Sequence, residues 1–420
     1  MEIKVPYGHG WLTVDCPAQN LAGVVYPREV PPRDEQTIIR EALMHPLEAD
    51  LLPAFLADGT ETLCIVNDAT RPTPTPRILD YLAEHLERPI KFLVATGSHR
   101  PPTPAECRQI FGPWFKRFQK DIFIHDARET EAMVPLGTTT RATSLAINRL
   151  IVEAPKIMAL SSVEPHYFAG YTGGRKSFFP GVAAYETIEQ NHRLALQGEA
   201  APLALAGNPV HEDLVEAMGH LTAKKIYSLQ VVLDRDHHIC AAFCGSLAES
   251  FAAAAQKAKE VFTVELNEQA DIVVSVAQVP LDIDLYQAHK ALEHGKRALK
   301  PGGILILVAP CSGGIGNDRF YQLLSRAAAP AEVSALITDA YHLGDHKAAK
   351  IAALAKEAQL WGVTDLDPTI MQKAFIKPCT DLQEAVEAAI AEQGPHAQCL
   401  FLMNAGMLVP MVNMNDESPS

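Results

Sequence analysis

The chain of 420 residues lacks the features that would place it in a membrane or on nucleic acid. It has no run approaching the ~18 apolar residues of a membrane helix, and its opening segment, MEIKVPYGHGWLTVDCP, lacks the basic stretch and apolar core of a secretory signal. Basic residues are outnumbered: the chain has 36 Lys and Arg and 50 Asp and Glu, so its net charge is −14. Since such a chain repels phosphate backbones and anionic lipids, we expect no nucleic-acid or membrane partner and a cytoplasmic location.

Closely spaced cysteines are almost absent as well. The eight cysteines are scattered, mostly within apolar stretches, so we expect buried free thiols. Cys240 and Cys244 alone are close, and His237 and His238 precede them. No second ligand cluster with the spacing of a zinc site follows, so free thiols are favoured over a metal site there.

The composition and the hydrophobic pattern indicate an α/β fold. Hydrophobic residues make up 48% and charged residues 20%, as in ordinary globular proteins. Short β-branched runs alternate with longer helical patterns, which is typical of parallel α/β structure. Strands are expected at 61–68, 90–99, 121–127 and 155–166, and a second strand–helix–strand pattern at 271–278, 284–299 and 302–310.

We therefore predict two α/β domains with mostly parallel sheets. The N-terminal domain is expected over residues 1–268 and the C-terminal domain over residues 269–420. The tail at 412–420 is expected to be disordered, because it is short, polar and terminal.

Polar side chains gather where the expected strands end, which is where open α/β sheets bind ligands. Asp68 and Arg71 follow the first strand, His99 ends the second, and Glu164 and His166 end the fourth. A carboxylate, a guanidinium and two imidazoles at one edge would form an anion-binding acid–base site. Taken singly, each of these residues could equally cap a helix or decorate a surface loop.

The stretch 166–177 nearly matches a phosphate-binding loop. Gly170, Lys176 and Ser177 fit the pattern G-x4-G-K-[ST], but Arg175 occupies the position of its second glycine, which argues against a standard nucleotide triphosphatase. A glycine-rich turn with a lysine between two histidines suits a loop that presents an amine. Desolvated lysine amines bond to carbonyl-type groups, and neutral imidazoles ligate nickel or zinc.

Five motifs together resemble the nickel-dependent lactate racemase family of 2-hydroxyacid racemases and epimerases. The resemblance runs over most of the chain. The motifs are Asp-Ala-Thr-Arg at 68–71, Ala-Thr-Gly-Ser-His at 95–99, His-Tyr-Phe-Ala-Gly-Tyr-Thr-Gly-Gly-Arg-Lys at 166–176, Asn-His at 191–192 and Tyr-Gln-Ala-His-Lys at 286–290.

The resemblance implies a cofactor, the nickel pincer nucleotide, a pyridinium-3,5-bisthiocarboxylic acid mononucleotide with nickel. It implies that Lys176 tethers this group covalently, that Gly173 and Gly174 contact it, and that His192 is the protein ligand to nickel. Enzymes that make the cofactor are then expected as partners.

The resemblance also implies the residues that act on the substrate. In the N-terminal domain, His99 and His166 become the catalytic acid–base pair, Asp68 orients His99, and Arg71 faces the substrate carboxylate. In the C-terminal domain, the motif at 286–290 contributes Tyr286, Gln287 and Lys290, which are expected to close over the acid in the cleft between the domains.

Elementary chemistry agrees with this assignment. A histidine with a pKa near 6.5 cannot readily remove the weakly acidic C2 hydrogen of a 2-hydroxy acid. Hydride transfer avoids that barrier, because a base takes only the hydroxyl proton and a planar 2-keto acid forms that can be reduced from either face. Two bases are then needed, one for each enantiomer.

We therefore predict an isomerase, a racemase or epimerase of lactate or a related 2-hydroxy acid such as malate. Two alternatives remain: a P-loop-like phosphate-binding enzyme built on residues 170–177, and a non-catalytic two-lobed module that binds a carboxylic acid. The glycine-rich loop at 311–316 could cradle a phosphate or form an ordinary turn. His342 and His346 are expected to cap a helix or line a cleft rather than ligate a metal.

Overall fold

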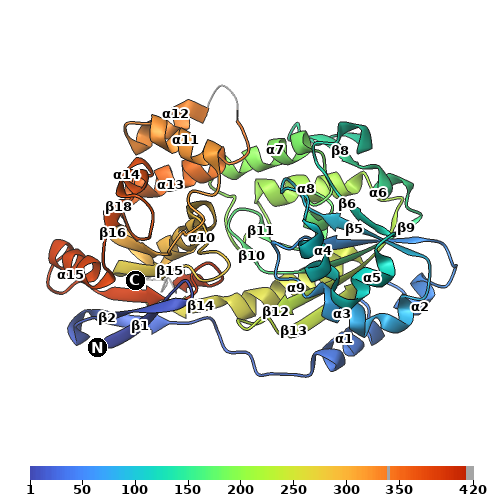
Figure 1. Ribbon diagram of the computed structural model, residues 1–420, viewed down its shortest axis with the longest axis horizontal. Coiled ribbons are helices and arrows are strands. Elements are labelled where there is room, and N and C mark those ends of the chain that lie inside the picture. The colour runs from blue at the N-terminus through green and yellow to red at the C-terminus, as the bar shows by residue number, and fades with distance from the viewer. Residues whose placement is uncertain (338–340, 413–420) are drawn as a thin grey trace, which may run out of the picture. The chain divides into compact units, whose positions relative to one another are not determined.

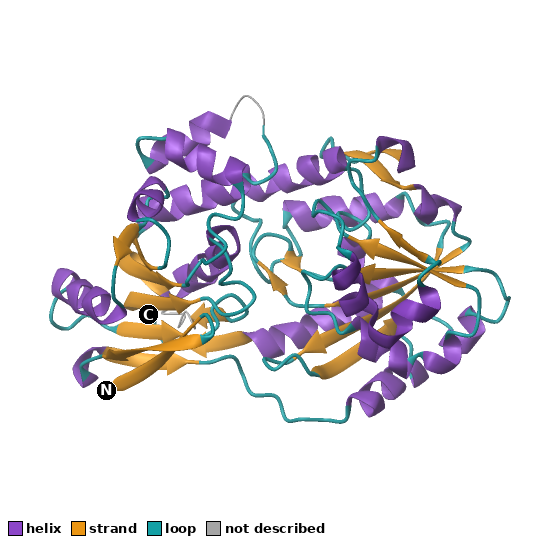
Figure 2. Ribbon diagram, in the orientation of Figure 1, coloured by secondary structure: helices purple, strands orange, loops and turns teal. Residues whose placement is uncertain are grey.

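The computed structural model describes residues 1–337 and 341–412, so the expected disorder at 412–420 falls almost wholly outside the described part. The chain divides into two compact units. The large unit comprises Glu29–Val261, and the small unit comprises Met1–Arg28 together with the residues from Phe262 onward. Each unit is an α/β structure with a mostly parallel six-stranded sheet, which confirms the predicted fold class (Figure 2).

The large unit is built on a sheet of order β13-β12-β9-β4-β5-β6, in which only β13 runs antiparallel to its neighbour. Its strands are β4 (Thr62–Asn67), β5 (Ile90–Ala95), β6 (Ile122–Ile124), β9 (Lys156–Ser162), β12 (Lys225–Leu233) and β13 (Ile239–Gly245). Two small hairpins lie outside this sheet, β7 (Met133–Thr138) with β8 (Ser144–Asn148), and β10 (Pro165–His166) with β11 (Gly170–Tyr171).

Helices cover both faces of this sheet, as Figure 1 shows. One face packs on an apolar cluster with α1 (Glu35–Met44), α2 (Leu52–Phe55), α3 (Thr75–Tyr81), α4 (Pro104–Phe111) and α5 (Phe115–Phe118). The other helices are α6 (Arg149–Glu153), α7 (Tyr185–Arg193), α8 (Pro209–Gly219) and α9 (Leu247–Phe262). Strand residues such as Cys64, Val66 and Phe92 have no exposed surface, so burial of their apolar area supplies most of the driving force for this layer.

The small unit has an all-parallel sheet of order β18-β17-β16-β15-β19-β3. Its strands are β3 (Leu21–Val25), β15 (Ala270–Val276), β16 (Leu299–Val308), β17 (Gln359–Val363), β18 (Lys377–Cys379) and β19 (Cys399–Leu402). The remaining strands are the hairpin β1 (Glu2–Tyr7) and β2 (Gly10–Asp15), and the pair β14 (Thr263–Leu266) and β20 (Val409–Val412). Its helices are α10 (Leu285–Gly295), α11 (Asp318–Arg326), α12 (Pro330–Ile337), α13 (Asp345–Glu357), α14 (Pro368–Lys373) and α15 (Leu382–Gln393).

The N-terminal segment lies in a different unit from the one we expected. We placed residues 1–268 together, but β3 pairs with β19, almost 380 positions later in the chain. The hairpin before it buries Ile3, Val5 and Val14 in the core of the small unit. The first 28 residues therefore join the unit formed by the C-terminal part of the chain, because their apolar face is covered there.

Within the described ranges, no helix combines the length and the apolar character that a membrane crossing requires.

Candidate active site

The loop after β4 and the loop after β5 meet at a carboxylate–imidazole pair. Asp68 is buried, with 6% of its surface exposed, and its Oδ2 lies 2.8 Å from Nδ1 of His99. The Oδ1 atom of Asp68 accepts hydrogen bonds from the hydroxyl of Thr70 at 2.7 Å and from its backbone N–H at 3.2 Å. Burial by itself would raise the pKa of Asp68, but the hydrogen bond and charge of His99, the hydroxyl bond of Thr70 and the charge of Arg71 together outweigh burial and lower it. The ionised carboxylate fixes the proton of neutral His99 on Nδ1, which leaves Nε2 as a base.

The second imidazole is held in the opposite way. His166 ends the short strand β10 and is 9% exposed. Its Nδ1 accepts hydrogen bonds from the backbone N–H groups of Ala169, at 3.3 Å, and Phe168, at 3.5 Å. In a neutral ring these bonds assign the proton to Nε2. The two histidines therefore differ, because Nε2 of His99 is an acceptor and Nε2 of His166 is a donor.

The loop that carries Lys176 is packed tightly against the sheet. Residues Gly174–Ser177 form a single 3-10 turn that is wholly buried, and Lys176 is 8% exposed. A Cβ at Gly173 would lie 2.6 Å from Val163, and one at Gly174 would lie 2.6 Å from the ring of Phe251. Both glycines also have positive φ, +74° and +54°. Packing of the loop on the protein thus explains why glycine stands at these two positions, which we had expected to contact a cofactor.

Arg175, which breaks the phosphate-loop pattern, lies beneath this loop. Its guanidinium stacks 4.6 Å from the ring of Phe251 and donates to the carbonyl of Ala169 at 2.9 Å. Burial lowers its pKa to about 9. The side chain that replaces the second glycine is therefore part of the support of the loop.

The ring of Phe168 connects three of the predicted site residues. His166 packs edge-on against it with ring centroids 4.5 Å apart, and His192 does the same at 5.0 Å. The amine of Lys176 lies 5.5 Å from the centroid of the same ring. His166, Lys176 and His192 therefore surround one aromatic side chain that the sequence did not single out.

The position of His192 suits a neutral metal ligand. It lies in the last turn of α7, and burial together with the charge of Lys176 lowers its pKa to about 3. The charges of His99 and Arg71 contribute further to this lowering. The large unit thus brings the predicted site side chains near one another: Asp68, Arg71, His99, His166, Lys176 and His192.

Two buried polar atoms that have no hydrogen-bond partner among the described residues lie next to Lys176 and His192, the residues that the resemblance assigns to the cofactor. Within the described part of the chain, Oγ of Ser177 and Oδ1 of Asn191 are buried and have no hydrogen-bond partner. Ser177 follows Lys176, and Asn191 precedes His192. Buried polar atoms normally find partners, so these two indicate room in the bonding pattern for a bound polar group. With a neutral imidazole as metal ligand, the residues present fit a tethered metal-containing cofactor.

The small unit carries the other predicted residues on α10. Tyr286, Gln287 and Lys290 are all partly buried, and Asp284 caps this helix by accepting the N–H of Gln287 at 2.7 Å. The ammonium of Lys347, on α13, lies 3.4 Å from the centroid of the Tyr286 ring and donates to its backbone carbonyl. Sequence reasoning did not find Lys347, since a lysine in an Ala/Lys-rich helix has no distinguishing local signal.

The glycine-rich loop at 311–316 supports α10. The backbone N–H groups of Leu285 and Tyr286 donate to the carbonyls of Gly314 and Ile315, both at 3.1 Å. A Cβ at Gly316 would lie 2.4 Å from the carboxyl carbon of Asp284. Of the two alternatives left open, this packing favours the structural turn, because a carboxylate lies against the loop and would repel a phosphate.

His346 lies in the first turn of α13 and His342 precedes this helix; among the residues that the structure describes, neither belongs to a group of three potential metal ligands. The backbone N–H of His342 donates to Asp345, whose buried carboxylate forms an ion pair with the partly exposed Arg319 at 3.0 Å. Nδ1 of His346 lies 2.7 Å from the hydroxyl of Tyr341.

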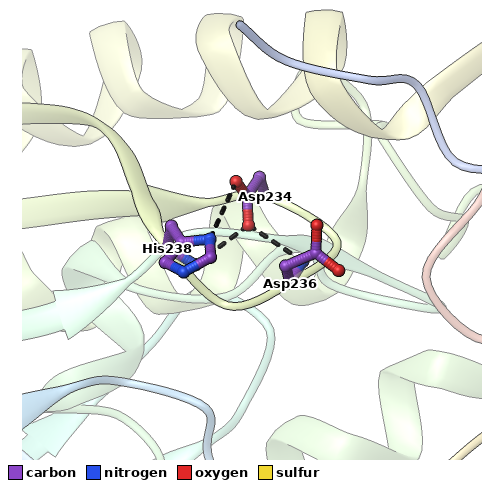
Figure 3. A group of neighbouring side chains, drawn as sticks. All are labelled: Asp234, Asp236 and His238. Atoms are coloured by element: carbon purple, nitrogen blue, oxygen red, sulfur yellow. Dashed lines mark hydrogen bonds and ion pairs between the residues drawn. The ribbon is translucent and has the colours of Figure 1, made fainter. Parts of the chain in front are cut away.

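A group of three potential metal ligands, Asp234, Asp236 and His238, lies in the turn between β12 and β13 (Figure 3). Asp234 closes this turn by accepting the backbone N–H groups of Asp236 and His238, both at 2.9 Å. Exposed acidic turns of this kind are common without a metal, and nothing else here points to one. The eight cysteines are all free, as expected, and six of them are buried.

Comparison with known proteins identifies the family. The model of the lactate racemase N-terminal domain matches residues 7–203, and that of the lactate racemase C-terminal domain matches residues 265–409. A lactate racemase of Thermoanaerobacterium thermosaccharolyticum is 30% identical over 403 residues, covering 92% of this chain and 94% of the relative. A lactate racemase of Lactiplantibacillus plantarum is 31% identical over 417 residues, covering 94% and 96%.

The solved structures agree. The lactate racemase apoprotein of T. thermosaccharolyticum superposes with a TM-score of 0.90 at 29% identity, covering 98% of this chain and 100% of that one. A Thermotoga maritima protein shares the fold with a TM-score of 0.68 at 17% identity, covering 86% and 96%. With both domain models matched and two relatives aligned over more than nine tenths of their length, this chain belongs to the lactate racemase family, a family of isomerases.

Proposed function

We propose that this protein is a racemase or epimerase of 2-hydroxy acids, acting in the cytoplasm on lactate or a related acid such as malate. The observation that carries the proposal is the pair of histidines with opposite hydrogen-bonding patterns beside Lys176 and His192. One ring offers an acceptor and the other a donor, which is what inversion at a hydroxyl-bearing carbon requires. Family membership and the two lactate racemase relatives give the substrate class.

Lys176 and His192 are the residues that would hold the cofactor, the first by a covalent link and the second as a ligand to nickel. When bound, the nickel pincer nucleotide would supply an acceptor and donor of hydride for C2 of the substrate. The low pKa of His192 keeps its imidazole neutral at physiological pH, so binding a metal displaces no proton from it.

His99 is proposed as the base that takes the hydroxyl proton of one enantiomer. Its Nε2 carries the lone pair, and the carboxylate of Asp68 stabilises the imidazolium that forms. The Nε2–H of His166 donates a hydrogen bond to the same substrate oxygen, and the proton held on His99 returns to that oxygen when the 2-keto acid is reduced, so both rings end the turnover as they began. Inversion follows because the planar 2-keto acid can be reduced from either face.

Charged and polar side chains bind the substrate in this proposal. Arg71 follows Asp68 by three residues and pairs with the carboxylate of the acid, since guanidinium groups bind carboxylates through two parallel hydrogen bonds. Tyr286, Gln287 and Lys290 share the first two turns of α10 and are proposed as the contribution of the small unit to substrate binding.

The test begins with the protein co-expressed with enzymes that make the cofactor. Intact mass, peptide mapping and nickel analysis should show an adduct of pyridinium-mononucleotide size on Lys176 with nickel present. Chiral chromatography should then show interconversion of lactate or malate enantiomers. The Lys176→Ala variant should carry no adduct.

Two results would contradict the proposal. Racemisation by Lys176→Ala at the wild-type rate would refute the tether. A wild-type chain that stays unmodified in a host that loads another family member would leave the binding-module alternative, in which an acid stabilises the protein without exchange at C2.

A further inference from the structure

A buried amide lies beneath the lysine loop, between two apolar residues of strand β12. Gln230 belongs to β12, between Leu229 and Val231, and has no exposed surface. Its two neighbours face the apolar cluster under α1–α5, so Gln230 points to the opposite face of the sheet. An amide removed from water costs free energy unless its oxygen and nitrogen find partners, so its bonds indicate what it is there to hold.

The oxygen of Gln230 makes two hydrogen bonds. It accepts the hydroxyl of Ser161 on β9 at 2.7 Å and the backbone N–H of Gly174 at 2.9 Å. The nitrogen of the amide donates to Oγ of Ser228 at 2.9 Å, and Ser228 pairs with Ser250 on α9 at 2.7 Å. The amide is thus oriented from two sides, and its oxygen is aimed at the loop.

The bond to Gly174 fixes the start of the turn that carries Lys176. Gly174 is the first residue of the 3-10 turn, so its N–H has no acceptor within the turn itself. The N–H of Lys176 donates to the carbonyl of Gly173 at 3.0 Å, and a Cβ at Gly173 would stand 2.8 Å from the amide oxygen of Gln230. The loop therefore lies directly on this oxygen.

The far side of Lys176 is fixed by backbone bonds. Its carbonyl accepts the N–H of Gly181 at 3.0 Å, and the carbonyl of Gly181 accepts the N–H of Gly97 at 2.9 Å. Gly97 stands two residues before His99. A shift at the start of the turn is consequently passed to Lys176, whose other side is anchored to the loop of the catalytic histidine.

We propose that Gln230 is a positioning residue that holds the turn at Gly174 and thereby sets where the amine of Lys176 lies for covalent loading. It touches neither substrate nor cofactor. The inference rests on the proposed function only for the loading step, since the anchoring of the turn can be measured in the unloaded chain.

The test uses the full-length Gln230→Met variant, which keeps the volume of the side chain and removes the amide. In the unloaded protein, hydrogen exchange of the Gly174 amide should be faster by about tenfold or more, because its acceptor is lost. After co-expression with the cofactor-making enzymes, the fraction of chains with an adduct on Lys176 should fall at least about fivefold by intact mass, while activity per loaded chain stays at the wild-type value.

Ser228→Ala is the matched control. It removes the partner of the amide nitrogen but leaves both hydrogen bonds of the amide oxygen in place, so Gly174 exchange and the adduct fraction should change far less than in Gln230→Met. Should Gln230→Met fail to fold, Ser161→Ala decides the matter, because it removes one of the bonds that orient the amide oxygen and should raise Gly174 exchange in part.

Unchanged Gly174 exchange and unchanged loading in Gln230→Met would overturn the inference, as would an equal loss in Ser228→Ala. If the wild type itself carries no adduct, the proposed function fails, and Gly174 exchange still tests the anchoring.

Discussion

Replacing Asp68 by Asn should remove the base of the proposed reaction while leaving the fold intact. In the native protein the Oδ2 atom of Asp68 receives the Nδ1 proton of His99 at 2.8 Å, while Oδ1 serves Thr70. An Asn at 68 keeps its oxygen toward Thr70 and turns its NH2 group toward His99. The imidazole must then accept at Nδ1 and carry its proton on Nε2, so the lone pair that would take the substrate proton is gone.

The size of the effect follows from that geometry. A misplaced tautomer removes general-base catalysis, which contributes about two to four orders of magnitude, so kcat of the loaded Asp68→Asn enzyme should fall by at least about a hundredfold. Loading of Lys176 should be unaffected, since the carboxylate of Asp68 bonds to Thr70 and His99 and not to the lysine loop. Thr70→Ala is the matched control, because it removes the hydroxyl bond to Oδ1 but keeps the carboxylate against His99.

Two assays check this prediction. Chiral analysis of the loaded variants gives kcat, and 15N chemical shifts of the unloaded protein report the tautomer of His99 directly. The expected pattern is Nδ1–H in the wild type and in Thr70→Ala, and Nε2–H in Asp68→Asn. An Asp68→Asn enzyme with wild-type kcat, or a His99 that keeps its Nδ1 proton in that variant, would refute the reasoning.

Two further predictions concern stability. Gly316→Ala should lower the free energy of unfolding, measured by urea titration, by more than Gly314→Ala does. Both glycines have φ near +80°, but only a Cβ at 316 would meet the Asp284 carboxylate. Equal losses in the two variants would show that backbone strain alone determines the effect. Burial lowers the pKa of His125 to about 4, whereas a histidine in the unfolded chain has a pKa of ~6.5. Between these two pH values the unfolded state binds more protons than the folded state. The free energy of unfolding contributed by His125 should therefore fall as the pH falls, by up to about 3 kcal/mol. A His125→Gln variant should lose that part of the pH dependence, and a variant with the wild-type pH profile would contradict the assignment.

The strand ends of the large unit were predictable from the sequence because the signal is local. A buried apolar run followed by polar residues predicts both the strand and its functional end, and β4, β5 and β9 lie within the ranges expected for them. The pairing of Asp68 with His99 then follows from adjacency of parallel strands, which is a property of the fold class. What the pattern could not supply is the N-terminal segment, since the partner of β3 is set by tertiary packing with a strand almost 380 residues away.

The residues that sequence reasoning missed act through other residues. Phe168 was passed over because a phenylalanine in a buried stretch is ordinary core, yet its ring lies between His166, Lys176 and His192. Gln230 offered a faint signal, an amide between apolar residues near the end of β12.

That faint signal has a general physical basis. A polar group at a fully buried strand position costs free energy unless it is hydrogen-bonded, so its presence implies a fixed polar partner. The first backbone N–H groups of a helical turn have no acceptor within the turn and can serve as that partner. Catalytic side chains at strand ends can be found from the sequence by their residue type, because the reaction requires particular functional groups. The groups that hold those side chains in place are defined only by contact, so a buried amide predicts that something is anchored, and the structure is needed to show that Gln230 anchors the turn of Lys176.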